Sequence, residues 1–314
     1  MISIVIVNWN SGNQLTDVLS SVDHYHSGWV ESVIVVDNAS MDDSVSLAES
    51  KASGWHFPLQ VIRNLENKGF GAACNQGAAL AKTEFLLFLN PDARLFADSL
   101  ETVVEFMRRR ENADVGVVGL QLVDAQGHIS RSCSRFPYVG AFIAHATGIN
   151  RLPGFSKMDL HMSDWPHDKT RVVDHVIGAF YLIRRTLFES LHGFDEHFFV
   201  YLEDLDLSLR VHQAGYKSVF LAEAQAFHAG GGTSHQVKAR RLFYFLRSRL
   251  VYAFKHFSWL GALGVLLATL LVEPLSRSAL ALLRRSWPNF KETWAAYGLL
   301  WRWLPQWIFK GTTR

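Results

Sequence analysis

The sequence predicts an α/β fold: a mainly parallel, twisted sheet flanked by helices, extended at its C-terminal end by a helical region. Short apolar runs, typical of strands buried on both faces, alternate with segments of helical periodicity in the first half of the chain. Strands that alternate with helices form right-handed βαβ units, and such units build parallel sheets. The composition changes after residue 235, where basic residues and tryptophan become prominent.

The expected elements follow one another from the N-terminus. A helical pattern runs through Leu15, Leu19 and Val22, and a second helix, opened by glycines, is predicted over residues 69–80. We expect a loop region with few motifs over residues 140–176. The predicted strands cover residues 2–7, 32–36, 59–62, 84–89 and 115–118.

Length and composition bound the domain organisation. At 314 residues the chain can bury a core as one large or two modest domains, and we divide it into residues 1–235 and 236–314. No basic segment precedes the first strand, so we expect no cleaved signal peptide. The two cysteines, Cys74 and Cys133, lack the spacing of metal ligands, which fits a reducing, cytoplasmic compartment.

Polar residues follow three of the predicted strands. Because ligands of parallel sheets bind beyond the carboxyl ends of the strands, these residues are candidates for a binding site. Asparagine, aspartate and serine are also ordinary turn formers, so each position taken alone is equally explained by its turn. Three such positions at one edge of the sheet favour a site. The residues are Asn8 and Asn10, Asp37 and Asn38, and Asn90 and Asp92.

A glycine-containing segment, Asn67-Lys68-Gly69-Phe70-Gly71, precedes the helix that carries Asn75. Glycines at a helix start let a ligand approach backbone N–H groups, and the helix dipole there favours a phosphate. The spacing differs from that of a Walker A loop, and no GxGxxG follows the first strand. The segment is therefore a weak indication of phosphate binding and does not indicate a dinucleotide site.

Two side chains are candidate ligands of a divalent cation. Proline fixes the turn Asn90-Pro91-Asp92 after an apolar strand, and Asp92 can present a carboxylate oxygen to a hard cation. His228 lies at a strand-like end before three glycines. A lone histidine is more often structural, but one beside a glycine turn in a chain with clustered carboxylates is a candidate ligand. Oxygen and imidazole donors suit Mn²⁺ or Mg²⁺ rather than a structural zinc.

The segment from Gly193 to Arg210 carries five carboxylates among four bulky aromatic residues. Carboxylates that lose hydration among aromatic rings are costly unless they bind a cation or move a proton. In a helix that begins near Leu202, Glu203 and Asp204 fall in the first turn, where the helix dipole favours negative charge. Two interpretations therefore stand: Glu203 and Asp204 are capping acids, or they belong to a catalytic site.

Seven segments of the chain form a recognisable set when they are taken in order. They read IVIVNWNSG, VIVVDNASMDDS, NKGFGAACNQG, LLFLNPDA, IGAFYLIRR, GFDEHFFVYLEDLDLSLR and FHAGGGTS. Together they resemble the family 2 glycosyltransferases, and within that family the rhamnosyltransferase-like branch. The resemblance covers residues 1–235, which would form the catalytic domain.

The resemblance implies a GT-A fold and a defined reaction. A sugar would pass, with inversion, from a nucleotide-diphosphate donor to a hydroxyl of a glycan or lipid-linked acceptor in cell-surface polysaccharide synthesis. The candidate donor is dTDP-L-rhamnose. Two other functions stay open on this fold. A nucleotidyltransferase would release pyrophosphate, and a non-catalytic nucleotide-sugar-binding scaffold would release nothing.

The resemblance also implies roles for residues by their position. Asp37 would contact the nucleotide base or ribose, and Asp92 would bind the divalent cation, Mg²⁺ or Mn²⁺, with His228 as a second ligand. Asp204 would be the general base, supported by Glu203. An asparagine stands at position 90, where the family's DXD motif has an aspartate, so the metal site has one negative charge fewer. The other residues expected to bind the nucleotide sugar are Asn8, Asn67, Gly69, Asn75 and Asn90.

The C-terminal tail, residues 236–314, contains 13 basic and two acidic side chains, whereas the rest of the chain has 18 basic and 27 acidic ones. Basic residues interleaved with tryptophan suit an anionic membrane surface. Residues 257–272 are apolar, but these 16 residues are fewer than the roughly 20 that a spanning helix needs. The residues concerned are Arg240, Arg241, Arg247, Arg249 and Lys255 before the apolar run, and Arg284, Arg285, Trp287, Lys291, Trp294, Trp301, Trp303 and Trp307 after it.

We therefore expect a cytoplasmic enzyme held peripherally on the inner face of the cell membrane. Packing of the tail on the catalytic domain or in a homo-oligomer stays open as an alternative. Nucleic acid is not an expected partner, although basic and aromatic residues also serve that purpose.

Overall fold

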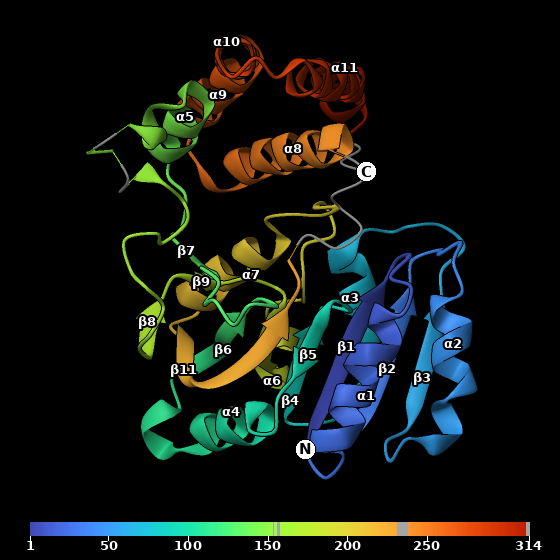
Figure 1. Cartoon of the computed structure of the whole chain (residues 1–314). Helices are drawn as coiled ribbons and strands as arrows, with labels where there is room; N and C mark the ends of the chain where they lie inside the picture. Colours follow the sequence, from blue (N-terminus) through green and yellow to red (C-terminus); the bar gives the residue numbers. More distant parts are fainter. Residues whose placement is uncertain (153, 156–157, 231–237, 312–314) are drawn as a thin grey trace. The chain divides into compact units, whose positions relative to one another are not determined.

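The structure is a computed structural model that describes residues 1–152, 154–155, 158–230 and 238–311. The chain forms two compact units, which we describe separately (Figure 1). The second unit includes two segments from before residue 235 as well as the C-terminal helices. The first unit comprises the described parts of Met1–Arg135, Trp165–Glu196 and Glu203–Thr233, and the second those of Phe136–Asp164, His197–Leu202 and Ser234–Arg314.

One large mixed sheet, built from nine strands of the described chain, organises the first unit. Its order is β3 (Leu59–Arg63), β2 (Val30–Asp37), β1 (Ile2–Asn8), β4 (Phe85–Leu89), β10 (Phe180–Arg184), β6 (Val115–Val123), β11 (Lys217–His228) and β5 (Ala93–Leu95), with β8 (Arg171–Val173) paired to β11. The strands β3, β2, β1 and β4 pair in parallel. β10 then runs antiparallel between β4 and β6, and β11 is parallel to β6. The predicted α/β class is confirmed, with a parallel N-terminal half and mixed pairing beyond it.

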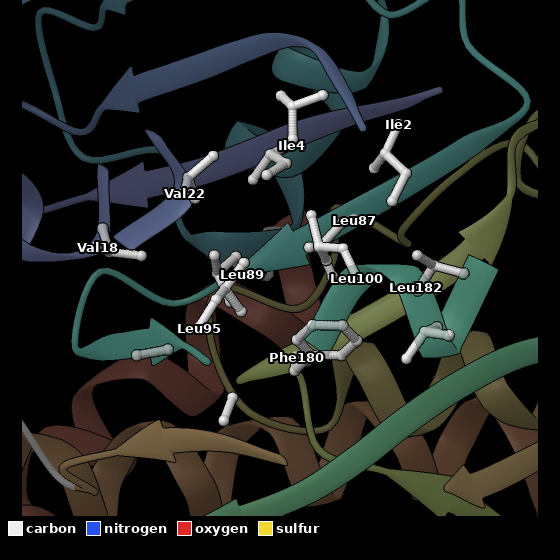
Figure 2. Packing of buried hydrophobic residues seen from close by; sticks show 14 of the residues in the cluster. Ile2, Ile4, Val18, Val22, Leu87, Leu89, Leu95, Leu100, Phe180 and Leu182 are labelled. Atoms are coloured by element: carbon white, nitrogen blue, oxygen red, sulfur yellow. The ribbon is translucent and has the colours of Figure 1, made fainter. Parts of the chain in front are cut away.

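β1 lies in the middle of the parallel half, and all of its side chains are buried. Ile2 and Ile4 point into the main hydrophobic core, which Phe180 of β10 also enters (Figure 2). Helices α1 (Gln14–His26) and α4 (Ser99–Arg108) contribute their apolar faces to the same core. This burial on both faces is the reason that β1 reads as a continuous apolar run in the sequence.

Helix α3 (Phe70–Ala78) packs against β1 and β2 through residues that are not part of that core. A Cβ atom on Gly77 would lie 2.5 Å from Cγ1 of Val5 and 3.2 Å from Cγ2 of Val36. Only glycine allows so close an approach of a helix to a sheet. The helix predicted over residues 69–80 is confirmed, and Gly77 within it serves packing.

The remaining elements of the first unit include helix α7 (Glu203–Gln213), which begins at the paired acids as the sequence predicted. Arg210 Nε donates to Asp206 Oδ2 at 2.8 Å, four residues apart on this helix, and the Asp206 carboxylate is buried. The other elements are α2 (Ser44–Ser50), α6 (Arg185–Ser190), the 3₁₀ turns η1 (Ala52–Gly54) and η2 (Arg110–Asn112), and a small antiparallel pair, β7 (Cys133–Ser134) and β9 (His175–Val176).

The second unit is helical in its described residues. Helix α5 (Val139–Thr147) lies in the region where we expected only loops, and that prediction is wrong for these residues. The helix forms because it buries Phe142 together with three alanines, an apolar face that needs a partner. The other elements are η3 (Ile149–Arg151), α8 (Lys238–His256), α9 (Trp259–Leu267), the π-helical η6 (Ala268–Val272), α10 (Glu273–Leu283) and α11 (Trp287–Lys310).

Residues 197–202 belong to this helical unit because α8 holds them. Ser248 Oγ donates a hydrogen bond to the carbonyl oxygen of Val200 at 2.8 Å. The rings of Phe199 and Tyr244 lie 5.0 Å apart between centroids.

The helices α9, η6 and α10 form one continuous helix, Trp259–Leu283, of 25 residues. Its most apolar part has a mean hydropathy of 1.7, and 28% of that part is buried. By length and composition it could cross a membrane, and it is the one such helix among the described residues. A core helix of a soluble protein can meet the same criterion. The helix extends beyond the apolar run of residues 257–272, and Pro274 follows directly after the π-helical turn η6 within it.

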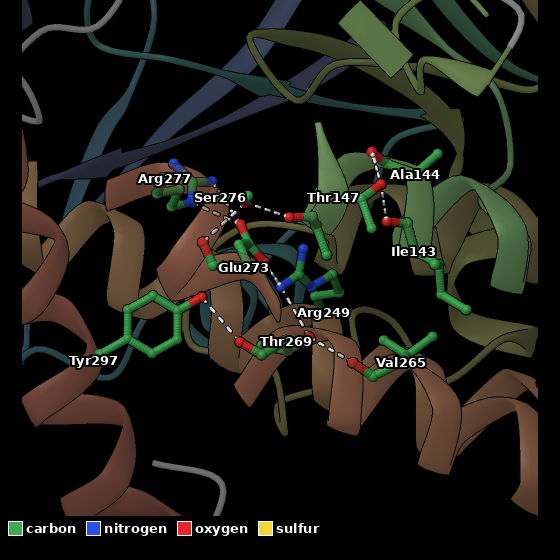
Figure 3. Close-up of polar contacts among 11 residues, drawn as sticks. Ile143, Ala144, Thr147, Arg249, Val265, Thr269, Glu273, Ser276, Arg277 and Tyr297 are labelled. Atoms are coloured by element: carbon green, nitrogen blue, oxygen red, sulfur yellow. Dashed lines mark hydrogen bonds and ion pairs between the residues drawn. The ribbon is translucent and has the colours of Figure 1, made fainter. Parts of the chain in front are cut away.

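We predicted that the basic residues and tryptophans of the tail face a membrane, and for three of them this is wrong. Arg247, Arg249 and Trp303 are buried within the second unit. Arg249 pairs with the buried carboxylate of Glu273, and its Nη2 donates to Oγ1 of Thr269 at 2.9 Å (Figure 3). A buried charge requires such partners, so the arginine packs inward with its carboxylate.

Candidate active site

The carboxyl ends of β1 and β2 meet at Asn8 and Asp37, which are direct neighbours in the sheet register. Asn8 is fully buried, and its Nδ2 donates to Asp37 Oδ1 at 2.8 Å and to Ser44 Oγ at 2.9 Å. Ser40 Oγ donates to the same Asp37 oxygen at 2.5 Å. Asn8 therefore lies at the predicted strand end, and its side chain fixes the Asp37 carboxylate.

The glycine segment before α3 is attached to the end of β2. Gly69 has a φ of 87°, a left-handed conformation that favours glycine, and its N–H donates to Asn67 Oδ1 at 2.9 Å. Asn38 Nδ2 donates to the carbonyl oxygen of Gly69 at 3.1 Å. The N-terminus of α3 is thus fixed beside the strand ends, where its backbone N–H groups can bind an anion.

Asn75 connects α3 to the acidic segment that contains Gly193 and Phe194. Its Nδ2 donates to the Phe194 carbonyl oxygen, and its Oδ1 accepts from the Phe194 N–H, both at 2.9 Å. Gly193 has a φ of 69°, and a Cβ on it would lie 2.4 Å from Asn75 Oδ1. Asn75 Nδ2 also donates to Glu196 Oε1 at 3.2 Å, so the structure gives Asn75 a role in positioning this segment.

Asp92 and His228, the predicted cation ligands, lie together at the ends of β4 and β11. Their Oδ1 and Nε2 atoms are 3.3 Å apart, and both side chains are largely buried. The backbone fixes the pair, because Ala229 donates its N–H to the Asp92 carbonyl oxygen at 3.1 Å and β5 pairs Ala93 with His228.

The described residues contain no group of three or more His, Cys, Asp or Glu side chains suited to a metal ion. Asp92 and His228 offer one oxygen and one nitrogen donor, which fits Mg²⁺ or Mn²⁺ only when other ligands complete the sphere. Diphosphate oxygens of a donor and water are ligands of that kind. Asp92 and His228 could therefore hold such a cation only together with ligands of that kind.

Asp204 and Glu203 begin α7 and have different environments. The Asp204 side chain is 18% exposed, and its two oxygens accept backbone N–H groups: Oδ2 from Gly178 and Oδ1 from Leu205, both at 2.8 Å. Glu203 is 4% exposed. Burial raises the pKa of the Glu203 carboxyl well above its ordinary value, and the adjacent charge of Asp204 raises it further. Asp204 is consequently the more accessible member of the pair.

A short segment before β10 brings Asp204 and the Asn90–Asp92 turn together. Gly178 donates its N–H to Asp204, and the next residue, Ala179, accepts the Asn90 N–H on its carbonyl oxygen at 3.1 Å. Asp204 and the Asn90–Asp92 turn therefore hydrogen-bond to successive residues, Gly178 and Ala179, directly before β10. A Cβ on Gly178 would meet Asp204 Oδ2 at 3.3 Å, so a glycine suits this position.

Sequence reasoning did not single out His175, which lies beside Asp204. Its Nε2 is 3.6 Å from Asp204 Oδ2, and its Nδ1 is 3.0 Å from Ser208 Oγ. Ser208 follows Asp204 by four residues on α7, so helical spacing was the available signal for Ser208. No sequence pattern places His175 there, because β9 reaches this site only through the tertiary fold.

The model of the family described as "Glycosyl transferase family 2" matches residues 3–206 of the chain. The chain belongs to glycosyl transferase family 2. The matched region extends from β1 into the first turn of α7 and includes Asp37, Asp92, Glu203 and Asp204. This family 2 protein is a glycosyltransferase, as the seven segments implied.

Curated relatives of this glycosyltransferase include rhamnosyltransferases. The chain is 24% identical over 272 residues to the N-acetylglucosaminyl-diphospho-decaprenol L-rhamnosyltransferase of Mycobacterium tuberculosis, with 82% of this chain and 86% of that protein covered. It is 31% identical over 168 residues to the rhamnosyltransferase WbbL of Escherichia coli, with 51% and 60% covered. The relatives place the enzyme among rhamnosyltransferase-like family 2 members.

Solved structures support the fold. The mannosyltransferase PcManGT from Pyrobaculum calidifontis, in complex with GDP-Man and Mn²⁺, matches 99% of this chain and 81% of its own with a TM-score of 0.57 and 19% identity. S. aureus TarS 1-349, in complex with UDP-GlcNAc, matches 95% and 91% with a TM-score of 0.54 and 15% identity. The expected GT-A fold of this glycosyltransferase is confirmed.

Proposed function

We propose that this glycosyltransferase moves L-rhamnose, with inversion, from a nucleotide-diphosphate donor such as dTDP-L-rhamnose to a hydroxyl of a lipid-linked glycan. Relatives named as rhamnosyltransferases support the donor sugar, and one of them has a name that specifies a diphospho-decaprenol acceptor. One observation carries the chemistry: Gly178 and Ala179, adjacent in the chain, hydrogen-bond to Asp204 and to the turn that bears Asp92.

Asp204 is the proposed general base. The acceptor hydroxyl oxygen attacks the anomeric carbon on the face opposite the diphosphate, its proton passes to the Asp204 carboxylate, and the nucleoside diphosphate departs. Two backbone N–H donors, of Gly178 and Leu205, fix the orientation of this carboxylate. Proton removal by a positioned base contributes roughly 10²–10⁴-fold to rate. Glu203, buried and with a raised pKa, supports the site without competing for this proton.

Asp92 and His228 are the proposed ligands of Mg²⁺ or Mn²⁺, in the company of the donor's diphosphate. When bound, the cation supplies positive charge that neutralises the leaving diphosphate. The chain's own part is to present one carboxylate oxygen and one imidazole nitrogen 3.3 Å apart at the strand ends. The Mn²⁺ of the related mannosyltransferase structure supports this assignment.

The nucleotide is proposed to bind along the ends of β1 and β2. Asp37 would contact the base or ribose, with Asn8 fixing its orientation from beneath. Gly69 and Asn67 would present the N-terminus of α3 to the diphosphate, and Asn90 would line the turn.

The second unit is proposed to hold the enzyme on the cytoplasmic face of the membrane. Large apolar side chains remain exposed along Trp259–Leu283 and α11, among them Trp259 at 67% and Leu283 at 83% exposure. Arg284 and Arg285 follow directly and are also exposed. Exposed apolar residues rimmed by basic ones favour an anionic lipid surface.

Vesicle flotation tests this attachment. The full chain is expected to float with vesicles that contain phosphatidylglycerol and to dissociate from them in part at high salt, because surface charge is screened. Equal recovery with and without vesicles would refute it, and a concentration-dependent mass in the absence of lipid would instead indicate a homo-oligomer.

A donor panel tests the reaction itself. Purified enzyme, Mn²⁺ or Mg²⁺, a panel of nucleotide sugars and a polyprenyl-diphosphate-linked GlcNAc acceptor are incubated together. Release of dTDP from dTDP-L-rhamnose with a glycosylated acceptor supports the proposal. Release of pyrophosphate would indicate a nucleotidyltransferase. Binding of a nucleotide sugar without turnover of any acceptor would indicate a scaffold.

A further inference from the structure

A chain of buried polar side chains leads away from Asp204 into the first unit. His175 on β9, Ser208 on α7 and Tyr181 on β10 are all buried. His175 Nδ1 lies 3.0 Å from Ser208 Oγ, and Ser208 Oγ lies 3.1 Å from the Tyr181 hydroxyl. His175 Nε2, on the other side of the ring, faces Asp204 Oδ2 at 3.6 Å. The neighbouring strands β9 and β10, together with α7, thus contribute to one line of polar atoms that ends at the proposed base.

The direction of the hydrogen bonds follows from Tyr181. Burial raises the pKa of its hydroxyl well above the ordinary value, so the group keeps its proton. Among the described residues, Ser208 is the hydrogen-bond partner of that hydroxyl, and a buried donor without an acceptor is costly. Tyr181 therefore donates to Ser208 Oγ, and the Ser208 hydroxyl is left to donate to His175 Nδ1.

This direction selects the tautomer of His175. A ring that accepts on Nδ1 carries its proton on Nε2 when it is neutral. Nε2–H then points at the Asp204 carboxylate. The separation of 3.6 Å exceeds a hydrogen bond, and catalytic hydrogen bonds in unliganded enzymes are often long and shorten in the reactive complex.

We propose that His175 is a positioning residue for Asp204, held in the required tautomer by Ser208 and Tyr181. The inference rests on the proposed role of Asp204 as the base. The Gly178 N–H already donates to Asp204 Oδ2 at 2.8 Å, and the His175 Nε2–H, which faces the same oxygen at 3.6 Å, becomes its second donor when that distance shortens in the reactive complex. Oδ1, which has the Leu205 N–H as its donor, is the oxygen left with capacity to take the acceptor's proton.

Other charged or titratable groups surround this line and stay unchanged in the test. Glu203 is adjacent to Asp204, and Cys74 on α3 feels the charge of both acids. Asp206 and Arg210 on α7 act on Tyr181 together with Asp204. Because these groups are common to all variants, a change in pH dependence reports on the substituted residue.

The test compares the pH dependence of kcat in His175→Phe, His175→Gln and Tyr181→Phe. Loss of a donor at Oδ2 disfavours the charged carboxylate, so the acid limb of the kcat profile is expected to move up by about one pH unit. We expect kcat at neutral pH to fall about 10- to 100-fold in His175→Phe, the size typical of lost outer-shell partners. His175→Gln keeps an N–H donor and is expected to restore part of the rate, with the donor KM near wild type throughout.

Substitution of a buried histidine can impair folding, so Tyr181→Phe, which removes only one oxygen atom, serves as a second variant. It is expected to shift the acid limb in the same direction as His175→Phe, by a smaller amount. Tyr297→Phe is the matched control, since Tyr297 is also buried and donates to the Thr269 carbonyl oxygen at 3.0 Å in the second unit. It is expected to leave the pH profile unchanged.

Two different failures are distinguishable. If Asp204→Asn keeps wild-type turnover, the role of Asp204 as base is wrong. If Asp204→Asn is inactive while Tyr181→Phe and folded His175→Gln keep the wild-type rate and acid limb, this inference alone is overturned.

Discussion

The replacement of Asp204 by asparagine is the perturbation that most directly tests the proposed chemistry. The carboxylate accepts the Gly178 N–H on Oδ2 and the Leu205 N–H on Oδ1, both at 2.8 Å. An asparagine has one oxygen and one NH₂ group, so in either orientation its NH₂ group meets a backbone N–H. The substitution therefore changes hydrogen bonding as well as charge.

The magnitudes follow from these two changes. Loss of the base is expected to lower kcat by about 10²–10⁴-fold, or about 2.7–5.5 kcal/mol of activation free energy. The opposed donors are expected to lower the free energy of unfolding by about 1–3 kcal/mol. Because Asp204 contacts protein backbone rather than the ends of β1 and β2 that are proposed to hold the nucleotide, donor binding should persist.

The assay measures kcat by release of the nucleoside diphosphate and donor binding by the rise in thermal midpoint at saturating donor. Asp42→Asn is a matched control, since Asp42 accepts the Gly12 N–H on Oδ2 at 2.8 Å and the Ser44 N–H on Oδ1 at 3.3 Å. It should lose comparable hydrogen bonds and keep the wild-type kcat. Wild-type turnover in Asp204→Asn would refute the reasoning, and loss of donor binding would place Asp204 in the donor site instead.

Three further predictions concern the metal, the buried ion cluster and a buried histidine. Asp92→Ala should weaken Mn²⁺-dependent donor binding about 10- to 100-fold and leave Mn²⁺-independent binding unchanged. Titrating the enzyme with donor, once in the presence of Mn²⁺ and once in the presence of EDTA, checks this. Equal weakening under both conditions would contradict it. Glu273→Ala leaves the fully buried Arg249 without its carboxylate and should lower the free energy of unfolding by about 3–5 kcal/mol. Arg277→Ala, at a partly exposed position, should lower it by less. Denaturant unfolding compares the two variants, and equal losses would contradict this expectation. Burial lowers the pKa of His145 to about 4 from its ordinary 6.5, so the folded state disfavours the protonated ring and stability should fall as pH drops from 6.5 toward 4, by about 2 kcal/mol at pH 5. His145→Asn should lose that pH dependence, and an unchanged slope would show that another group is responsible.

Several features of this enzyme were determined by local sequence and could be predicted. The strands of the parallel half are continuous apolar runs because both faces are covered, and Gly69 signals the left-handed turn before α3. Asp92 and His228 could each be proposed as a cation ligand from the turn or strand end at which they stand. Strands, turns and strand ends depend on neighbours in the chain, so periodicity and turn chemistry report them. The 3.3 Å approach of Asp92 to His228 is instead a tertiary contact between residues distant in the chain.

Other features were decided by tertiary packing. From the sequence, Arg249 was expected on the surface with the other basic residues of the tail. It is buried because Glu273, 24 residues away, provides a partner for its charge. In the sequence, Asn8 is an ordinary strand-end asparagine. In the fold it is buried against Asp37 and holds that carboxylate by a hydrogen bond. Helix α5 was missed because its short apolar face has meaning only beside the helices that cover it.

The chain by itself determined the family, the strand ends and the acids that can carry the chemistry. The family resemblance had assigned different roles to Asp204 and Glu203, and the tertiary structure supplied the physical difference by leaving one carboxyl accessible and burying the other. The tertiary structure alone brought His175 to the site. Burial and hydrogen-bond partners set the charge and orientation of a carboxyl, and both depend on segments that only folding brings together.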